Sequence, residues 1–400
     1  MKEDATPVSG TLRDIKALAE AERILAALVA IPSLPGTPNA KITDCLAAEL
    51  ARGGARLAVI KGPEGDRANI LASIGPADIP GYILSGHSDV VPVSGQDWSS
   101  DPFRLTARNG RLYGRGTSDM KGFVACALAL VPEFLAMDLA RPIHIAISYD
   151  EEIGCRGVGH MIEALPRLCA APLGCIVGEP SDLHPVLSHK GKLAAAISFT
   201  GRPGHSSDPR LGLNAIYPMA ELALFLRELA ARLEADGPFD SGFSPAWTTL
   251  QAGVVQGGQA VNIIPSLARL EFEIRTIPGI DASGIAQMIR DEAGRIAARG
   301  AMTGRQLGLA WEELSSYPAL PPSKDPGLAA ILSRFSGREV RQSVSYGTEA
   351  GLFHAAGIPS VICGPGAIDR AHRADEYITK DELADCLALL RGAVQSLCSR

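Results

Sequence analysis

Apolar positions recur along this chain with two different periods. Helical spacing of apolar residues predicts helices over residues 11–30, 41–53 and 123–134. Short runs that are almost wholly apolar lie between and after these segments, at residues 56–60, 69–74, 81–85 and 143–148. Short, fully apolar strands that alternate with helices are typical of an α/β sheet with helices on both faces.

The pattern changes near residue 192. An alternating strand at 192–200 is followed by a long helix at 214–233, two strands at 248–254 and 267–274, and a helix at 282–298. This order predicts a separate α+β module of about one hundred residues. The first pattern returns after residue 305 and ends in a helix at 380–397. We therefore predict a catalytic domain in two parts, 1–191 and 305–400, with a domain inserted at 192–304.

Composition narrows the function classes. The chain has 400 residues, of which 46% are hydrophobic, and its net charge of −6 provides no basic field to attract nucleic acid. Its eight cysteines are scattered without a CxxC pair, which predicts reduced core residues and not a disulfide framework or thiolate zinc site. Residues 1–10 do not resemble a signal peptide, and the longest apolar run, 123–137, is too short to cross a bilayer. We expect a cytoplasmic protein that does not bind nucleic acid or membrane.

Five polar side chains at strand ends or in turns are candidate metal ligands: His87, Asp119, Glu152, Glu179 and His372. Imidazole and carboxylate ligands without thiolate suit zinc, cobalt or manganese. One carboxylate bridging two metals, with a histidine and a carboxylate on each, would form a two-metal hydrolytic site. Taken singly, each residue has an ordinary reading: Asp119, for example, precedes a helix and could be its N-cap.

Asp89 follows His87 at the end of a predicted strand. Side chains at i and i+2 share a face of an extended chain, so these two would point the same way. A carboxylate beside an imidazole commonly holds a metal-ligating histidine in one orientation. Alone, the stretch would be read as a strand that ends in a polar turn.

Together, the motifs resemble those of the M20 family of metallohydrolases. They occur in the family's order: SGHSD at 85–89, GRGTSDMKG at 114–122, DEE at 150–152, GEP at 178–180 and AHRADEY at 371–377. The resemblance runs from about residue 20 to the C-terminus. It implies an α/β, zinc-aminopeptidase-like catalytic domain with a mixed sheet between helices. It also implies that the inserted α+β domain is a ferredoxin-like lid and dimerisation domain.

The resemblance assigns roles to residues of the predicted site. His87, Glu179 and a bridging Asp119 would hold one metal; Glu152, His372 and the same Asp119 would hold the second. Both metals are expected to be Zn²⁺, with Co²⁺ as the alternative. Asp89 would orient His87, and the Asp119–Met120 peptide bond would be cis. Glu151 would act as general base: it would take a proton from the metal-bridging water, which leaves a hydroxide, and pass that proton to the leaving amine.

The inserted domain is expected to contribute three further residues. The loop at 201–207 resembles the family loop whose histidine, here His205, reaches the active site of the other subunit of a homodimer and donates to the oxyanion. Asn262 and Arg275 match substrate-binding positions, and a guanidinium can hold a carboxylate with two parallel hydrogen bonds. Without the resemblance, Asn262 could lie in a plain turn and Arg275 could be a strand-surface charge.

Within the family, the sequence is most similar to the acetylornithine deacetylase group. This implies hydrolysis of N2-acetyl-L-ornithine to L-ornithine and acetate, a step of arginine biosynthesis. The alternatives of the same chemistry are a deacylase of another N-acyl amino acid, succinyl-diaminopimelate desuccinylase and an M20 carboxypeptidase. A dinucleotide-binding oxidoreductase is disfavoured, because Gly114 and Gly116 lack the third glycine of the fingerprint. A metal-free binding protein with this fold is a further alternative, although all five ligands and the base are present.

Overall fold

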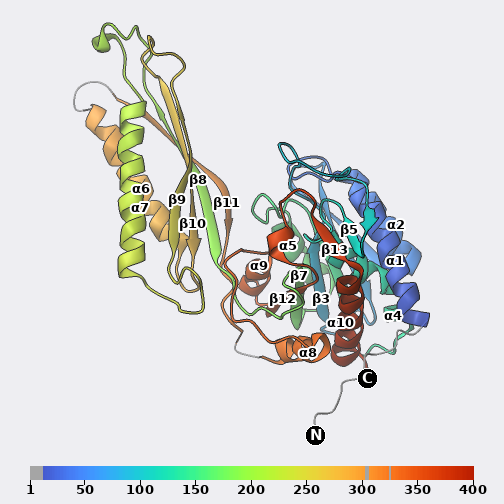
Figure 1. The fold of residues 1–400 in the computed structure, drawn as a ribbon. Helices are drawn as coiled ribbons and strands as arrows, with labels where there is room; N and C mark the ends of the chain where they lie inside the picture. The colour runs from blue at the N-terminus through green and yellow to red at the C-terminus, as the bar shows by residue number, and fades with distance from the viewer. Residues whose placement is uncertain (1–11, 302–305, 324–325) are drawn as a thin grey trace. The chain divides into compact units, whose positions relative to one another are not determined.

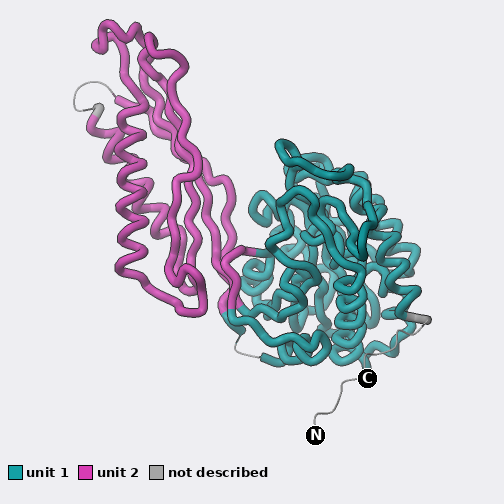
Figure 2. The backbone as a smooth tube through the Cα atoms, in the orientation of Figure 1, with its two compact units in different colours: residues 1–187, 322–342, 348–400 teal, residues 188–321, 343–347 magenta. Residues whose placement is uncertain are grey.

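The computed structural model describes residues 12–301, 306–323 and 326–400 (Figure 1). The chain divides into two compact units, which Figure 2 colours separately. Unit 1 comprises residues 1–187, 322–342 and 348–400, and unit 2 comprises residues 188–321 and 343–347. Among the described helices, none has both the length and the apolar character that crossing a bilayer requires.

Unit 1 is built on a mixed six-stranded sheet in the order β1-β2-β6-β3-β7-β12. Its strands are β1 (Arg56–Lys61), β2 (Ala68–Ile74), β3 (Tyr82–His87), β6 (Ile143–Ser148), β7 (Gly174–Pro180) and β12 (Ser360–Gly364). The first two pair in antiparallel fashion, and β6, β3, β7 and β12 run parallel to one another. The carboxyl ends of these four strands therefore meet at one edge, which is where open α/β sheets bind ligands.

Helices cover both faces of this sheet (Figure 1). One face carries α1 (Leu12–Val29), α2 (Ala40–Gly53), α3 (Lys121–Ala129), α4 (Val131–Ala136), α8 (Gly327–Ser336) and α10 (Lys380–Cys398). The opposite face carries α5 (Val158–Leu168) and α9 (Ala350–Ala355). The fully apolar strands follow from this arrangement, because both faces are buried.

The helix predicted at 123–134 is two helices. The first, α3, begins earlier at Lys121, and α4 starts after Leu130 with Pro132 in its first turn. Proline has no backbone N–H to continue the hydrogen-bond ladder of a helix, but it is tolerated in a first turn. Lys121 is buried, and its Nζ donates to the carbonyls of Leu28 (2.9 Å) and Ile31 (3.0 Å), which ties the start of α3 to the end of α1.

A three-stranded sheet that the sequence pattern did not predict joins two distant segments of unit 1. It has the order β13-β5-β4, with β13 at Tyr377–Thr379, β5 at Arg111–Tyr113 and β4 at Thr106–Arg108. Each strand has only three residues, too few to show a period in the sequence. This sheet brings the loop that follows β5 next to the loop that precedes β13, and these loops contain Asp119 and His372.

Unit 2 has the strand and helix order of a ferredoxin-like fold. Its elements are β8 (Gly191–Thr200), α6 (Ile216–Asp236), β9 (Thr249–Gly257), β10 (Leu267–Thr276), α7 (Ala282–Ala301) and β11 (Gly308–Tyr317). The strands form an antiparallel sheet in the order β11-β8-β10-β9. Both helices pack on one face of it around a core that includes Leu222, Leu270 and Ile289.

The compact unit 2 extends beyond the predicted inserted domain of 192–304. Strand β11 pairs with β8 along almost its whole length, so the unit continues to Pro321. The segment Gly308–Tyr317 is mostly exposed, and buried and exposed positions alternate only over its last three residues. The sequence pattern therefore gave no signal for this fourth strand, which completes the sheet.

Candidate metal centre

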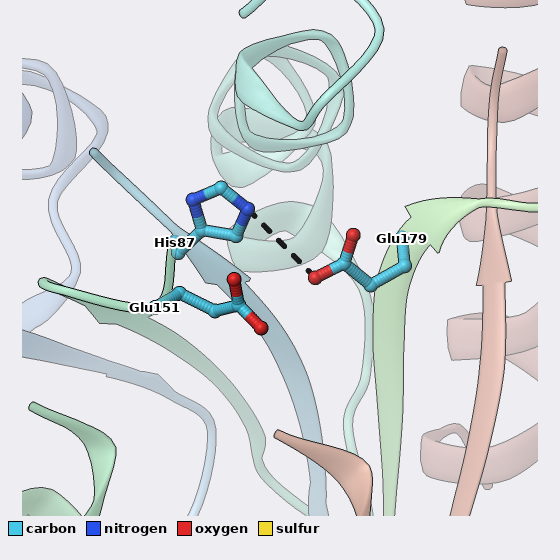
Figure 3. Close-up of side chains that lie close together, drawn as sticks. All are labelled: His87, Glu151 and Glu179. Carbon is cyan, nitrogen blue, oxygen red and sulfur yellow. Dashed lines mark ion pairs between the residues drawn. The ribbon is translucent and has the colours of Figure 1, made fainter. Parts of the chain in front are cut away.

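Three neighbouring parallel strands deliver acidic and imidazole side chains to one edge of the unit 1 sheet. His87 is the last residue of β3, Glu151 follows β6, and Glu179 lies at the end of β7. One potential ligand atom from each lies within 4.8 Å of the other two, and His87 Nε2 is 3.7 Å from Glu179 Oε1. Figure 3 shows the three side chains converging, His87 and Glu179 from the ends of two strands and Glu151 from a loop.

Asp119 stands between two histidines. Its Oδ1 lies 3.1 Å from His87 Nε2, and its Oδ2 lies 3.3 Å from His372 Nε2. His372 Nε2 is also 3.0 Å from Glu152 Oε2. The structure therefore brings together all five predicted ligands, with each Asp119 oxygen facing a different histidine. The Asp119–Met120 peptide bond is cis, as the family resemblance implied.

Carboxylates are concentrated in this buried site. Burial, together with repulsion from neighbouring acids, raises the pKa of Glu151 to about 8, that of Glu152 to about 7 and that of Glu179 well above its ordinary value. Asp119 behaves differently: although burial opposes ionisation, hydrogen bonds from the two histidines lower the pKa of its carboxyl. Hydrogen bonds to Asp119 and Glu152 raise the pKa of His372 to about 10.

These side chains fit divalent metal ions. Like charges within a few ångströms of one another in a buried site repel, and a bound cation removes that repulsion and favours the ionised carboxylates. The donors are imidazole nitrogens and carboxylate oxygens, with no thiolate among the predicted ligands, which suits zinc, cobalt or manganese. His87 is only 1% exposed, whereas the His372 side chain is 52% exposed, so the His372 side of the site is open to solvent.

Asp89 organises the backbone around the site. Its two carboxylate oxygens accept the backbone N–H groups of Glu151 and Glu152, each at 3.1 Å. His87 Nδ1 lies 2.9 Å from the Asp89 backbone carbonyl and 3.6 Å from its carboxylate. Asp89 therefore contacts His87 mainly through its carbonyl, whereas the sequence had pointed to its carboxylate. The carboxylate holds the turn that presents Glu151 and Glu152.

A second carboxylate fixes the same turn from the other side. Asp150 adopts a left-handed φ of 55°. Its side chain accepts a hydrogen bond from the backbone N–H of Gly36 at 2.7 Å and forms a close ion pair with Arg67. Neither contact was predicted, because Gly36 and Arg67 lie 114 and 83 positions away from Asp150 in the sequence. A charge pattern within the motif itself could not have revealed this partner.

Two more residues near the site were missed from the sequence. Glu349 is 1% exposed and accepts hydrogen bonds from Ser85 Oγ (3.4 Å) and, more closely, Ser148 Oγ. Burial raises the pKa of Glu349 to about 7. The Cys155 thiol donates to Glu151 Oε1 at 3.2 Å. Glu349 belongs to the stretch TEA at 348–350, to which the sequence analysis assigned no role.

The three predicted residues of unit 2 lie at two ends of its sheet. His205 and Asn262 occupy adjacent exposed loops, where Ser206 N donates to the Asn262 carbonyl at 3.1 Å. The backbone N–H of Ser207 donates to His205 Nδ1 at 3.2 Å, so Nε2 carries the ring hydrogen in the neutral imidazole. Arg275 lies eight residues along β10 from Leu267, a distance of about 26 Å in an extended strand.

Arg275 already has a carboxylate partner. Its Nε donates to Glu273 Oε1 at 3.0 Å and its Nη2 to Glu273 Oε2 at 3.2 Å, while Nη1 contacts the Tyr317 hydroxyl at 3.3 Å. The sequence alternative for Arg275 was a strand-surface charge, and the structure pairs this charge with Glu273. A substrate carboxylate at Arg275 would have to share or displace Glu273.

A comparison with protein families identifies the family to which the chain belongs. The family model described as peptidase family M20/M25/M40 matches residues 83–396, more than half of the chain. The chain belongs to this family. Its members depend on metal, and all five predicted ligands lie within the matched residues.

Relatives of this M20 chain include named bacterial enzymes. An acetylornithine deacetylase of Aliivibrio fischeri is 34% identical over 84% of this chain and 86% of its own length. An acetylornithine deacetylase of Proteus mirabilis is 32% identical over 93% of this chain and 95% of its own length. The chain is thus an amide hydrolase of the M20 family that is similar to acetylornithine deacetylases.

Solved M20 structures share the fold. An M20 metallo-carboxypeptidase of Sulfolobus solfataricus superposes with a TM-score of 0.75 at 18% identity, covering 94% of this chain and 98% of that one. Human carnosine dipeptidase 1 superposes with a TM-score of 0.73 at 18% identity, covering 96% and 98%. At these identities the comparison establishes the α/β fold with an inserted domain and does not identify a substrate.

Proposed function

We propose that this chain deacetylates N2-acetyl-L-ornithine to L-ornithine and acetate, the step of arginine biosynthesis expected from its sequence, at a centre of two divalent metals. The observation that carries the metal centre is Asp119, whose two oxygens face His87 at 3.1 Å and His372 at 3.3 Å. Support for the substrate comes from relatives named acetylornithine deacetylase, which are 32–34% identical to this chain over most of its length. A cytoplasmic location stays a prediction from the sequence.

In this proposal each metal has its own histidine and acid. His87 and Glu179 would hold one ion, His372 and Glu152 the other, and Asp119 would bridge them. Zn²⁺ is the favoured ion and Co²⁺ the alternative. When bound, such a pair polarises the amide carbonyl and makes water more acidic.

Glu151 is the proposed general base and acid. It stands beside His87 and Glu179 without belonging to either proposed ligand set, and Asp89 fixes its backbone. It would take a proton from the attacking water and give a proton to the nitrogen of the breaking C–N bond. The hydroxyl of the water would go to the acyl carbon, which gives acetate and the free amine of ornithine. Burial raises the pKa of Glu151, and a proton shuttle near neutral pH needs such a carboxyl.

We also propose a homodimer in which unit 2 supplies residues to a second copy. The loops of His205 and Asn262 begin at the Leu267 end of β10, about 26 Å along the strand from Arg275, which is longer than an N-acyl amino acid. The three residues cannot all contact one substrate from a single unit 2, but two copies could share them between sites. His205 Nε2–H would then donate to the oxyanion that forms from the amide carbonyl.

The exposed edge of unit 2 supports this assembly. Strand β9 is an edge strand and is exposed along most of its length, with Val255 58% exposed. Tyr217, on α6 beside β9, is 71% exposed. An open sheet edge with apolar side chains is a template for pairing with another chain.

Replacing Glu151 by Gln tests the proposed chemistry. We expect kcat for acetylornithine to fall by about 10²- to 10⁴-fold, because the shuttle for the proton is gone. Bound metal, measured by mass spectrometry of the purified protein, should stay at the wild-type level. Glu152→Gln is the matched comparison and should lose metal as well as activity. A Glu151→Gln variant with near-native kcat would refute the assignment of the base.

A hydrolysis panel tests the substrate. The wild-type protein, supplied with Zn²⁺ or Co²⁺, would be assayed with acetylornithine, other N-acetyl amino acids, succinyl-diaminopimelate and dipeptides. We expect acetylornithine to give the highest kcat/KM. If another compound ranks first, the substrate assignment fails, while the metal centre is still tested separately by metal content.

Mixing two inactive variants tests the exchange of residues between copies. His205→Ala and Glu151→Gln are each expected to be nearly inactive when purified alone. Co-expressed, they should recover roughly a quarter of wild-type activity, because half of randomly mixed dimers are hetero-dimers with one intact site. Hetero-dimers that form but remain inactive would contradict the proposal that His205 acts on the second copy.

A further inference from the structure

We propose that Glu376 is a positioning residue that, paired with Arg115, holds the Asp119 loop and the His372 loop together. Both residues belong to motifs that supported the family resemblance, yet neither is a proposed ligand, base or substrate contact. The inference rests on the proposed two-metal centre and adds the device that sets its geometry.

The Glu376 carboxylate is surrounded by donors from the loop that carries Asp119. Its Oε1 accepts the backbone N–H groups of Ser118 at 2.8 Å and Asp119 at 3.1 Å. Its Oε2 accepts the backbone N–H of Gly116 at 3.1 Å and Nη1 of Arg115 at 2.7 Å. Four donors from one five-residue segment thus converge on a single carboxylate, which is 1% exposed.

The same carboxylate belongs to the segment that carries His372. Glu376 lies four residues after His372 and immediately before β13, and its backbone carbonyl accepts Gly114 N at 3.0 Å. Position 119 and position 372 are far apart in sequence. Glu376 therefore links the two segments twice, through its backbone and through its side chain.

Arg115 extends this link to the backbone at His372. Its Nη2 donates to Gln96 Oε1 at 2.5 Å, and Gln96 Nε2 donates to the His372 carbonyl at 2.9 Å. Its Nη1 also contacts the Arg373 carbonyl at 3.3 Å. His372 has a left-handed φ of 62°, a conformation that a non-glycine residue keeps only when its surroundings hold it. Hydrogen bonds from Gln96 and Arg115 hold the carbonyl groups of His372 and Arg373, on the carboxyl side of His372.

The ordinary alternative is that this ion pair only stabilises the fold. A buried ion pair by itself is weak support for stability, because removing two charges from water is costly. Glu376 differs from an ordinary ion-pair partner in the donors that it binds, which are the backbone N–H of Asp119 and those of its close neighbours Gly116 and Ser118. Displacing these groups would move the carboxylate whose two oxygens face His87 and His372.

Glu376→Gln keeps the size of the side chain but replaces one acceptor oxygen with an NH₂ group that cannot accept the surrounding N–H donors. Partners behind metal ligands typically contribute 10- to 100-fold to metal affinity, and we expect a loss of that order here. The loss should be greater for the ion held by Glu152 and His372 than for the ion held by His87 and Glu179.

The test compares wild type, Glu376→Gln and a matched control, Glu133→Gln. Glu133 forms a two-pronged pair with Arg391 at 2.8 and 3.1 Å in unit 1, and it is not part of the proposed site. Each protein would be stripped with a chelator, titrated with Zn²⁺ by calorimetry, and unfolded thermally without metal. We expect wild type and Glu133→Gln to bind two ions with the same affinities, and Glu376→Gln to bind one ion about 10- to 100-fold more weakly.

A purely structural role predicts a different outcome. In that case Glu376→Gln would unfold at a lower temperature without metal but would bind both ions with wild-type affinity, and this result would overturn the inference. Should Glu376→Gln fail to fold, Arg115→Lys provides the same comparison, because lysine keeps the charge but cannot contact Glu376, Gln96 and Arg373 together. A wild-type protein that binds fewer than two ions would refute the proposed metal centre itself. Two ions in wild type with unchanged affinities in the variant would refute only the role of Glu376.

Discussion

Repulsion among buried acids is the constraint on which the rest of unit 1 depends. Asp119, Glu151, Glu152 and Glu179 meet at one sheet edge, where burial makes their ionised forms costly. The fold tolerates this because two histidines face Asp119, and because the chemistry of the donors suits divalent cations. An arrangement that would weaken an ordinary core is what a centre for metal-assisted hydrolysis requires.

Holding like charges together needs a rigid backbone beneath them, and the structure provides three such supports. Asp89 binds the N–H groups of Glu151 and Glu152, Asp150 anchors the same turn through Arg67 and Gly36, and Glu376 binds the loop of Asp119. Each support is itself a carboxylate that accepts hydrogen bonds from backbone N–H groups. In each case a carboxylate that is not a proposed metal ligand fixes the backbone of a residue that is a proposed metal ligand.

Much of this could be predicted from the sequence. Apolar runs located β3 and β6, and the residues at their ends and at the end of β7 proved to be neighbours because parallel strands end at one edge. The ligand set itself came from the order of the motifs, since His87 and His372 are linked by no sequence period. The residues with helical or strand periodicity were found, while the three-residue strands of the small sheet and the exposed strand β11 were not.

The supporting contacts could not be predicted for a different reason. Arg115 and Glu376 are separated by 261 positions in the sequence, and Arg67 and Asp150 by 83. No local sequence pattern therefore indicates either pair. Asp89 shows how a correct motif can still mislead in detail. It lies where the sequence placed it, but its carboxylate contacts the Glu151–Glu152 turn more closely than it contacts His87.

The most direct test of the central claim is anomalous diffraction from crystals of the protein grown with Zn²⁺ or Co²⁺. A two-metal centre bridged by Asp119 should give two anomalous peaks about 3.5–4 Å apart, on either side of the Asp119 carboxylate. One peak should contact His87 and Glu179, and the other His372 and Glu152. A single peak, or two peaks without Asp119 between them, would contradict the account.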